Sequence, residues 1–255
     1  MPRIPREKIV QALEAWVADE PKVLAAWEGG SASFGRADGF SDIDWVLLVE
    51  AADVDAMFPA VEKVLEQLSP IEASYTLPHP TWHGHAQTFY RLRDAAADHF
   101  VDLVVMHREA KDFFLQPELH GTPRMVCERI PVPRPPPLEG DKISAENRAR
   151  IAAITERHRV IGVLPGKEVR RGRPLDALAF YQSITLRHLV ELLRIEHDPH
   201  RPGFGLRYLE IDLPVAVRER LEPLLFVGGR EQLARAVEQA DAWIEELLGE
   251  GVGGR

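Results

Sequence analysis

The chain has 255 residues, of which 45% are hydrophobic and 28% charged; this composition excludes a disordered protein and suffices for one large or two modest globular domains. No apolar run approaches the roughly 20 residues needed to cross a bilayer, so we expect a soluble protein without a membrane partner. The net charge is −9, and the excess lies entirely in residues 1–140, which carry 13 Lys and Arg against 22 Asp and Glu; this sign disfavours nucleic acid as a partner.

The cysteine content indicates the compartment. Cys127 is the only cysteine in the sequence and therefore cannot form an intramolecular disulfide. The first residues also lack the continuous apolar segment of a secretion signal. Because a chain without disulfides suits a reducing interior, we predict a cytoplasmic location.

The first half of the chain mixes helical and strand patterns. Hydrophobic residues recur at helical spacing over 9–17, and a short apolar run over 22–27 predicts a strand that leads into a Gly29-Gly30 turn. The remaining predicted elements are a strand over 43–49, a helix over 53–68 and strands at about 71–77, 86–92 and 99–106. This order predicts an α/β (α+β) domain with a mixed sheet over residues 1–129.

A proline-rich connector and a helical region follow. Five prolines within residues 130–138 remove backbone donors, and they predict an extended linker over 130–140. Apolar residues then return at helical spacing over 144–163, 174–197, 214–226 and 230–248. We therefore expect an all-α helical bundle domain over 141–255. In its second helix, the periodicity leaves four polar side chains available for a cleft, and we expect most of them to be structural: Tyr181, Gln182, Thr185 and His188.

Two aspartates carry the clearest chemical signal. Asp42 and Asp44 stand at positions i and i+2 on the predicted strand, so both carboxylates point to one side while Ile43 and Trp45 face the core. Two carboxylates in one small volume repel each other unless a divalent cation lies between them. Magnesium, which prefers oxygen ligands and keeps phosphate in its coordination shell, is the expected ion.

A small-residue turn precedes the aspartates. Gly30 and Ser31 offer backbone N–H groups and a hydroxyl at the start of a helical turn, where phosphate oxygens bind readily. Glycine permits close approach of a ligand. Together with a metal-binding aspartate pair, this turn indicates phosphoryl or nucleotidyl transfer.

The segment 30–44 resembles the nucleotidyltransferase superfamily typified by DNA polymerase β. That family has Gly-Ser, a glycine four residues after the serine, and then Ser-Asp-x-Asp, and the chain matches each position from Gly30 to Asp44. The resemblance implies that Gly30, Ser31 and Ser41 bind the nucleotide and that Asp42 and Asp44 bind magnesium.

The family also uses a third carboxylate on a later strand. Asp102, flanked by apolar residues in His99–Met106, is the matching position, and Glu72 is a weaker contender. The resemblance implies that Asp102 either completes the metal site or acts as general base towards the acceptor hydroxyl, and both roles stay open.

The expected activity is magnesium-dependent transfer of a nucleoside monophosphate, AMP from ATP, to a hydroxyl of a small-molecule acceptor, with release of pyrophosphate. The two-domain plan resembles antibiotic adenylyltransferases that act on aminoglycosides and lincosamides. Two alternatives stay open: a toxin-type enzyme acting on a protein or tRNA, and a nucleotide-binding member of the fold without turnover.

Two further polar groups have weaker functional interpretations. Lys167, Arg170, Arg171 and Arg173 form a basic cluster between helices that could hold a triphosphate or simply lie in a solvated loop. His79, His83 and His85 could bind zinc or contact an acceptor, although no nearby cysteine completes a zinc site. An ordinary exposed loop is the simplest interpretation of the histidines.

Overall fold

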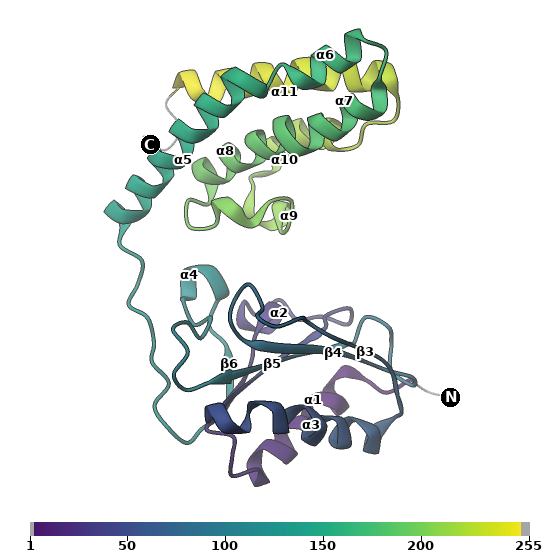
Figure 1. Cartoon of the computed structure of the whole chain (residues 1–255), viewed down its shortest axis with the longest axis vertical. Coiled ribbons are helices and arrows are strands. Elements are labelled where there is room, and N and C mark those ends of the chain that lie inside the picture. Colours follow the sequence, from purple (N-terminus) through teal and green to yellow (C-terminus); the bar gives the residue numbers. More distant parts are fainter. Residues whose placement is uncertain (1–2, 251–255) are drawn as a thin grey trace. The chain divides into compact units, whose positions relative to one another are not determined.

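The computed structural model describes residues 3–250, and the chain divides into two compact units, Met1–Pro137 and Leu138–Arg255. The first unit combines a mixed six-stranded sheet with helices, and the second is helical (Figure 1). The predicted fold class is therefore confirmed. The point of division falls within the predicted linker 130–140.

The sheet contains a single parallel pair of strands. Its strands are β1 (Ala25–Glu28), β2 (Ile43–Val49), β3 (Ile71–Thr76), β4 (Ala86–Leu92), β5 (Val101–His107) and β6 (Arg124–Glu128). They lie in the order β3-β4-β5-β2-β1-β6, and only β2 and β5 run parallel among these strands. β2 and β5 occupy the centre, which explains why both are apolar along nearly their whole length.

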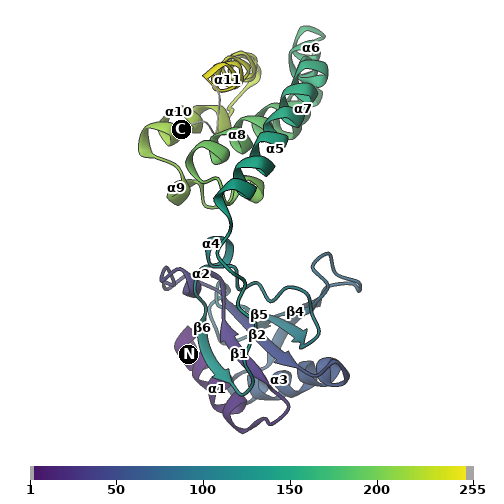
Figure 2. The same cartoon turned by 90° about the vertical axis from the view of Figure 1, so that its left-hand side faces the viewer.

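Two helices cover one face of the sheet. They are α1 (Arg6–Asp19) and α3 (Val54–Leu68), which lie side by side against the strands (Figure 2). Their apolar residues at helical spacing, such as Leu13 and Val61, pack against Ile43 and Val101 of the central strands. This core fixes which face of β2 and β5 is left for polar side chains.

The opposite face of the sheet carries a smaller apolar cluster. Trp27, Leu48 and Met106 pack there with Val132, which belongs to the proline-rich segment. Residues 131–139 form neither helix nor strand, as expected for a connector. However, Val132 is only 5% exposed, so the start of the predicted linker is anchored on the sheet by apolar burial.

The strand β6 has no counterpart among the predicted elements. It is short and half-buried and pairs with β1 alone, and the register of that pairing shifts between Ala26 and Trp27 of β1. Such an edge strand has no apolar alternation that a sequence pattern can detect. Between β5 and β6 lies one further short helix, α4 (Pro117–His120).

The second unit packs its helices around one apolar core. They are α5 (Gly140–Ile161), α6 (Leu164–Arg170), α7 (Pro174–Phe180), α8 (Arg187–His197), α9 (Leu209–Asp212), α10 (Val215–Leu225) and α11 (Arg230–Glu250). A π-helical segment, Tyr181–Leu186, joins α7 to α8. Leu189, Leu221 and Trp243 represent the core, which draws on α8, α10 and α11.

Most of the four polar side chains that the helical periodicity left for a cleft have structural positions, as expected. Tyr181, Thr185 and His188 are buried, and only Gln182 is exposed. The hydroxyl of Tyr181 donates to the carbonyl oxygen of Leu224 at 2.8 Å. A π-helical turn contains more residues than the 3.6 assumed for the pattern, so the segment turns different side chains toward the core.

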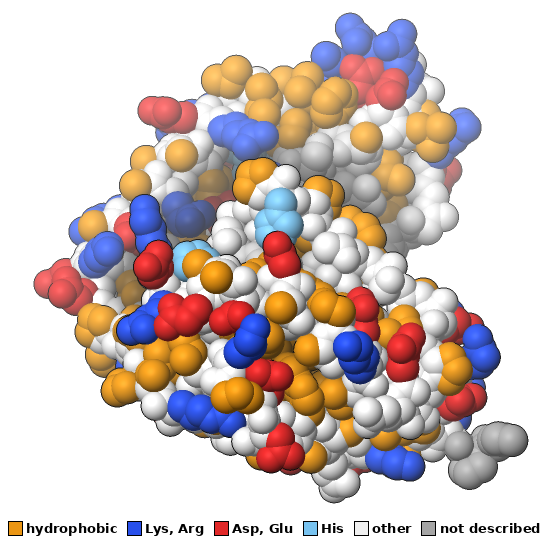
Figure 3. Space-filling view, turned by 60° about the horizontal axis from the view of Figure 1, so that its bottom comes forward, with side chains coloured by type: hydrophobic (Ala, Val, Ile, Leu, Met, Phe, Trp, Pro, Cys, Tyr) orange, Lys and Arg blue, Asp and Glu red, His pale blue; other side chains and the backbone are white. Residues whose placement is uncertain are grey.

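The described surface mixes charges of both signs. On the face shown in Figure 3, acidic and basic side chains alternate over short distances, with no continuous basic stripe among the described side chains. Exposed pairs such as Lys22–Asp53 account for part of this mixture. Within residues 3–250, no helix is long and apolar enough to span a membrane.

A buried arginine organises the helical unit. Arg194 of α8 is fully buried and forms an ion pair with Asp212 at 2.9 Å. Its remaining N–H groups donate to the carbonyl oxygens of Gly205, at 2.8 Å, and Arg207. Because a charge buried without partners is costly, this network is required to hold the segment between α8 and α10 in place.

Arg194→Met is expected to lower the free energy of unfolding by about 3 kcal/mol, because it leaves the Asp212 carboxylate buried with fewer partners. Urea unfolding followed by far-ultraviolet circular dichroism measures the change. Arg187→Met is the matched control, since Arg187 is exposed on the same helix and its replacement should shift stability by about 0.5 kcal/mol or less. Equal effects of the two substitutions would contradict the role given to Arg194.

Candidate active site

The parallel pairing of β2 and β5 places two aspartates side by side. Asp44 and Asp102 are direct partners in the register of the two strands. The preceding residues of the two strands, Ile43 and Val101, are paired in the same way and are fully buried against α1 and α3. Because side chains alternate along a strand, Asp44 and Asp102 both project from the opposite face of the sheet.

Asp42 lies one residue before β2, so its placement on the strand itself was wrong. The guanidinium of Arg6 donates to the carbonyl oxygen of Asp42 at 3.0 and 3.2 Å. Arg6 is also paired with the buried carboxylate of Glu28, which receives a second ion pair from Arg124. This network fixes the backbone where the chain enters the strand.

Asp102 has an unusual electrostatic environment. Burial raises the pKa of its carboxyl to about 6, and the nearby charge of Asp42 adds to that rise. A hydrogen bond from Gln87 opposes the rise in pKa. The repulsion by Asp42 indicates that these two aspartates lie close enough to interact.

The Gly30-Ser31 turn touches the Asp44 carboxylate. The N–H of Gly29 donates to the carbonyl oxygen of Asp44 at 2.8 Å, and a side-chain carbon on Gly30 would overlap Oδ2 of Asp44. Gly30 also has a φ of +52°, a conformation that favours glycine. Both constraints favour glycine at this position.

Ser31 contributes a hydroxyl without a partner. Its Oγ is buried and makes no hydrogen bond to any of the described residues. Buried hydroxyl groups are normally satisfied, so an unused donor beside Asp44 suits a ligand oxygen. The helix here, α2 (Gly30–Ser33), has only four residues, so the attraction of an anion would depend on this hydroxyl and the turn backbone.

Ser41 shapes the approach to Asp42. Its hydroxyl accepts from the N–H of Asp38 at 2.9 Å and donates to the Asp38 carboxylate at 3.1 Å. The N–H of Phe40 and the hydroxyl of Ser41 lower the pKa of Asp38. The Ser41 hydroxyl therefore stabilises this turn, and its contact with a nucleotide stays a prediction.

Gln87 is a site residue that the sequence did not indicate. Its Nε2 donates to Oδ1 of Asp102 at 2.6 Å, and its Oε1 lies 3.0 Å from Nε2 of His83. The N–H of His85 donates to Nδ1 of His83, which leaves the proton on Nε2 to bind Gln87. The amide of Gln87 is thus oriented with its NH₂ group toward Asp102.

The other histidines of this loop do not form a metal site. His85 is 3% exposed and packs edge-on against Phe114 at a ring-centroid distance of 5.0 Å. Burial lowers the pKa of His85. Because the described part of the chain contains no group of three or more His, Cys, Asp or Glu side chains that could hold a metal ion, the zinc alternative finds no support.

The same observation bears on magnesium. The three aspartates do not form a cage that holds a cation by themselves among residues 3–250. Magnesium, however, is usually bound by one or two carboxylates together with substrate phosphates and water. The paired Asp44 and Asp102, the nearby charge of Asp42 and the unused Ser31 hydroxyl therefore suit an ion that enters with a nucleotide.

Two weaker candidates are engaged elsewhere. Glu72 on β3 is paired with Arg91 of β4 at 2.9 Å and is half exposed. Three side chains of the basic cluster, Lys167, Arg171 and Arg173, lie within 4 Å of the buried Glu168 carboxylate, which offsets one of their positive charges. Lys167 and Arg170 belong to α6, so the predicted loop was wrong for these two, whereas Arg171 and Arg173 lie between α6 and α7.

Comparisons with known proteins address the fold. No family model and no curated protein matches the chain. An aminoglycoside 6-adenyltransferase from Bacillus subtilis has a TM-score of 0.40 and 12% identity, with 96% of this chain and 89% of that chain covered. A nucleotidyltransferase-like protein from Exiguobacterium sibiricum has a TM-score of 0.40 and 15% identity, with 97% and 77% covered.

Gly30→Ala is expected to abolish the magnesium-dependent ATP binding that the sequence predicts, because the added methyl group overlaps the Asp44 carboxylate. Thermal-shift titration with ATP and Mg²⁺ measures the loss. Gly35→Ala is the matched control, since Gly35 has a φ of +63° but no atom within 4 Å of the added carbon. Both variants bear a backbone strain of about 1–2 kcal/mol, so only the overlap with Asp44 distinguishes them. If Gly30→Ala still binds ATP, the Gly30-Ser31 turn is not part of the nucleotide site.

Asp102→Asn is expected to stabilise the metal-free protein at high pH. The folded pKa of about 6 exceeds the unfolded reference of 3.8, so the stabilisation from the protonated carboxyl is complete below about pH 4 and is lost as the pH rises through 6. The loss is on the order of 3 kcal/mol, and an asparagine does not titrate.

Unfolding curves in EDTA at pH 4.5 and pH 8 test this. The gain of Asp102→Asn over wild type should be larger at pH 8, and an equal gain at both values would contradict the raised pKa. Asp98→Asn, which removes an exposed carboxylate, controls for the change in net charge.

Proposed function

We propose that the chain is a magnesium-dependent nucleotidyltransferase that transfers a nucleoside monophosphate, AMP from ATP, to a hydroxyl of a small-molecule acceptor and releases pyrophosphate. The observation that carries this proposal is the pairing of Asp44 with Asp102 on β2 and β5, directly beside the Gly30-Ser31 turn. Two carboxylates and an unused hydroxyl at one edge of a sheet suit a metal-bound triphosphate.

Asp42 and Asp44 would hold the magnesium ion. When bound, the ion neutralises triphosphate charge and orients the phosphates for displacement. Gly30 admits the close packing of the turn against Asp44, and Ser31 would donate its free hydroxyl proton to a phosphate oxygen. Ser41 would act by holding the turn that presents Asp42.

Asp102 would serve as general base, with a role as third metal ligand as the alternative. A carboxylate with a pKa of about 6 is ionised at neutral pH and more basic than an ordinary aspartate, which suits proton abstraction. Gln87 binds Oδ1 of Asp102 and thereby orients the carboxylate, so Gln87 is a positioning residue for either role.

In the proposed reaction, the acceptor hydroxyl oxygen attacks the α-phosphorus of ATP. The new bond joins that oxygen to phosphorus, and the bond between the α-phosphorus and the bridging oxygen to the β-phosphate breaks. Pyrophosphate leaves with the electron pair, and the hydroxyl proton passes to Asp102. The protein contributes mainly position and electrostatic stabilisation.

A small-molecule acceptor is favoured over tRNA. The chain carries a net charge of −9, and the basic cluster near α6, whose charge Glu168 offsets only in part, is confined to residues 167–173. Binding to nucleic acid depends on unpaired Lys and Arg that neutralise phosphates. ATP and magnesium are both available in the cytoplasm, the location that the single Cys127 predicts.

The test is transfer of label from α-labelled ATP to a panel of hydroxyl-bearing small molecules in the presence of Mg²⁺. Asp44→Asn is expected to reduce labelling about a hundredfold or more, because it removes a proposed metal ligand. Asp42→Asn should have a similar effect, whereas Glu72→Gln, which removes a carboxylate paired elsewhere, should retain activity.

The outcomes separate the alternatives. If tRNA or protein in a cell extract becomes labelled and no small molecule does, the acceptor is a macromolecule and the proposed acceptor class is wrong. ATP and Mg²⁺ binding without pyrophosphate release from any acceptor would indicate a non-catalytic member of the fold. Full activity in both Asp42→Asn and Asp44→Asn would overturn the proposed site.

A further inference from the structure

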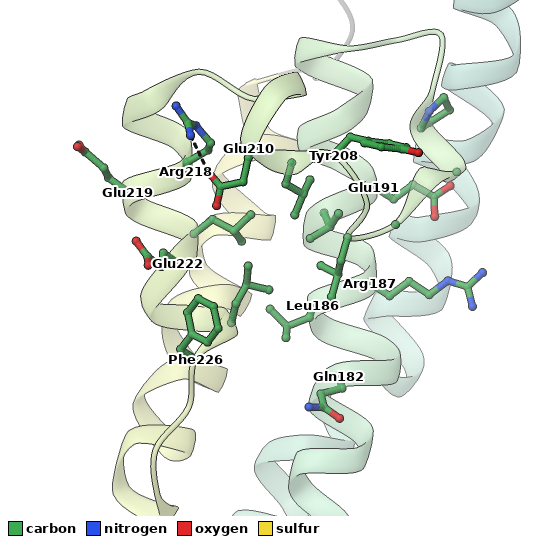
Figure 4. A pocket seen from close by; sticks show the side chains of 18 of the residues that line it. Gln182, Leu186, Arg187, Glu191, Tyr208, Glu210, Arg218, Glu219, Glu222 and Phe226 are labelled. Carbon is green, nitrogen blue, oxygen red and sulfur yellow. Dashed lines mark hydrogen bonds and ion pairs between the residues drawn. The ribbon is translucent and has the colours of Figure 1, made fainter. Parts of the chain in front are cut away.

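The helical unit contains a cavity of about 1100 Å³ that shares no residue with the candidate active site. It lies between α10 on one side and α8 with the π-helical segment on the other, and the segment between α8 and α10 covers one end (Figure 4). Its volume slightly exceeds the range that is usual for small-molecule sites, which is roughly 300–1,000 Å³.

One wall of this cavity is held rigidly. Gly205, Leu206 and Tyr208 line it, and the fully buried Arg194 binds the carbonyl oxygens of Gly205 and Arg207 within the same segment. Tyr208 has a φ of +61°, which costs free energy for any residue other than glycine. Backbone strain of this kind persists where the surroundings enforce it, often at ligand-binding segments.

The cavity exposes large apolar side chains. Among the side chains that line it, Leu206 is 60% exposed, Val215 58% and Phe226 72%. Leu186 of the π-helical segment and Leu221 of α10 form the apolar floor of the cavity. Contiguous apolar surface left open to water in a concave site is typical of sites that bind an apolar ligand.

The rim formed by α9 and α10 is acidic. Figure 4 shows Glu210 beside Arg218, its partner at 2.7 Å, and Glu219 and Glu222 on the same side of the cavity. Neither Glu219 nor Glu222 has an ion-pair partner among residues 3–250, so this rim has a net negative charge.

The opposite rim, formed by α5 and α8, has a net positive charge. Arg150 is paired with Glu191 at 3.0 Å, and Arg187 adds a positive charge. A ligand that entered the cavity would therefore be oriented by charge, with any cationic group at the α10 side. The exposed ring of Phe226 would favour a cation there as well, because aromatic faces attract cations.

We infer that this cavity binds a small organic cation with an apolar body, whose ammonium group lies at the acidic rim of Glu219 and Glu222. The apolar body lies against Leu186, Leu221 and Phe226. This inference does not rest on nucleotidyl transfer, since its test requires neither ATP nor Mg²⁺.

Two dansyl probes of equal tether length test the inference on the full chain. Dansylcadaverine ends in an ammonium group, and N-dansyl-6-aminohexanoic acid ends in a carboxylate, so they differ mainly in terminal charge. Dansyl emission rises when the ring leaves water. We expect saturable binding of dansylcadaverine and weaker binding of the acid, measured by fluorescence titration at low ionic strength.

The combined change Glu219→Gln and Glu222→Gln should weaken dansylcadaverine binding about threefold to tenfold and leave or improve binding of the acid. Glu156→Gln with Glu238→Gln is the matched control, since both residues are exposed in the helical unit and do not line the cavity. Phe226→Ala should weaken both probes by a similar factor, because it removes apolar surface. Each replaced residue is exposed, and circular dichroism verifies folding.

Several results would overturn the inference. These are absence of saturable binding by dansylcadaverine, equal binding of the two probes, or equal losses in the cavity and control variants. A dimer at the working concentration that Phe226→Ser dissociates would also overturn it, since the apolar surface would then belong to an interface between two copies of the chain.

Discussion

The parallel contact between β2 and β5 is the constraint on which the first unit depends. In a sheet whose other described pairs are antiparallel, it alone brings the starts of two strands to the same edge. A shift of one residue in this register would turn either Asp44 or Asp102 into the core, where Ile43 and Val101 now lie. The apolar burial of those neighbours against α1 and α3 therefore sets the position of the carboxylates.

Both units use a buried charge to hold irregular backbone next to a candidate site. In the first unit, Glu28 retains Arg6, and Arg6 binds the backbone at Asp42. In the second, Arg194 and Asp212 hold the segment that contains Tyr208. Apolar packing is non-directional, whereas a guanidinium donates along fixed directions to particular carbonyl oxygens. These networks thus determine the course of loops that have little core of their own.

The sequence predicted those helices and strands whose pattern of apolar residues is continuous along the chain. The strand 43–49 was found at its observed bounds, because both of its faces are buried and its run is apolar throughout. The strand β6 and the π-helical segment were missed, since a short edge strand has no alternation and a widened turn changes the helical period. The sequence could not predict the hydrogen bond between Gln87 and Asp102 either. This bond depends on the pairing of β4 with β5, and no spacing along the chain shows which strands pair.

The geometry at Gly30 limits how this protein can change. Its left-handed φ and its contact with the Asp44 carboxylate both act against any larger residue, which could fit only if the Asp44 side chain moved. Gly35 shares the conformation but has open space around it, where a side chain would meet backbone strain alone. A mutant library aimed at altered selectivity would thus favour glycine at position 30 and would find most of its diversity in side chains farther from the aspartates.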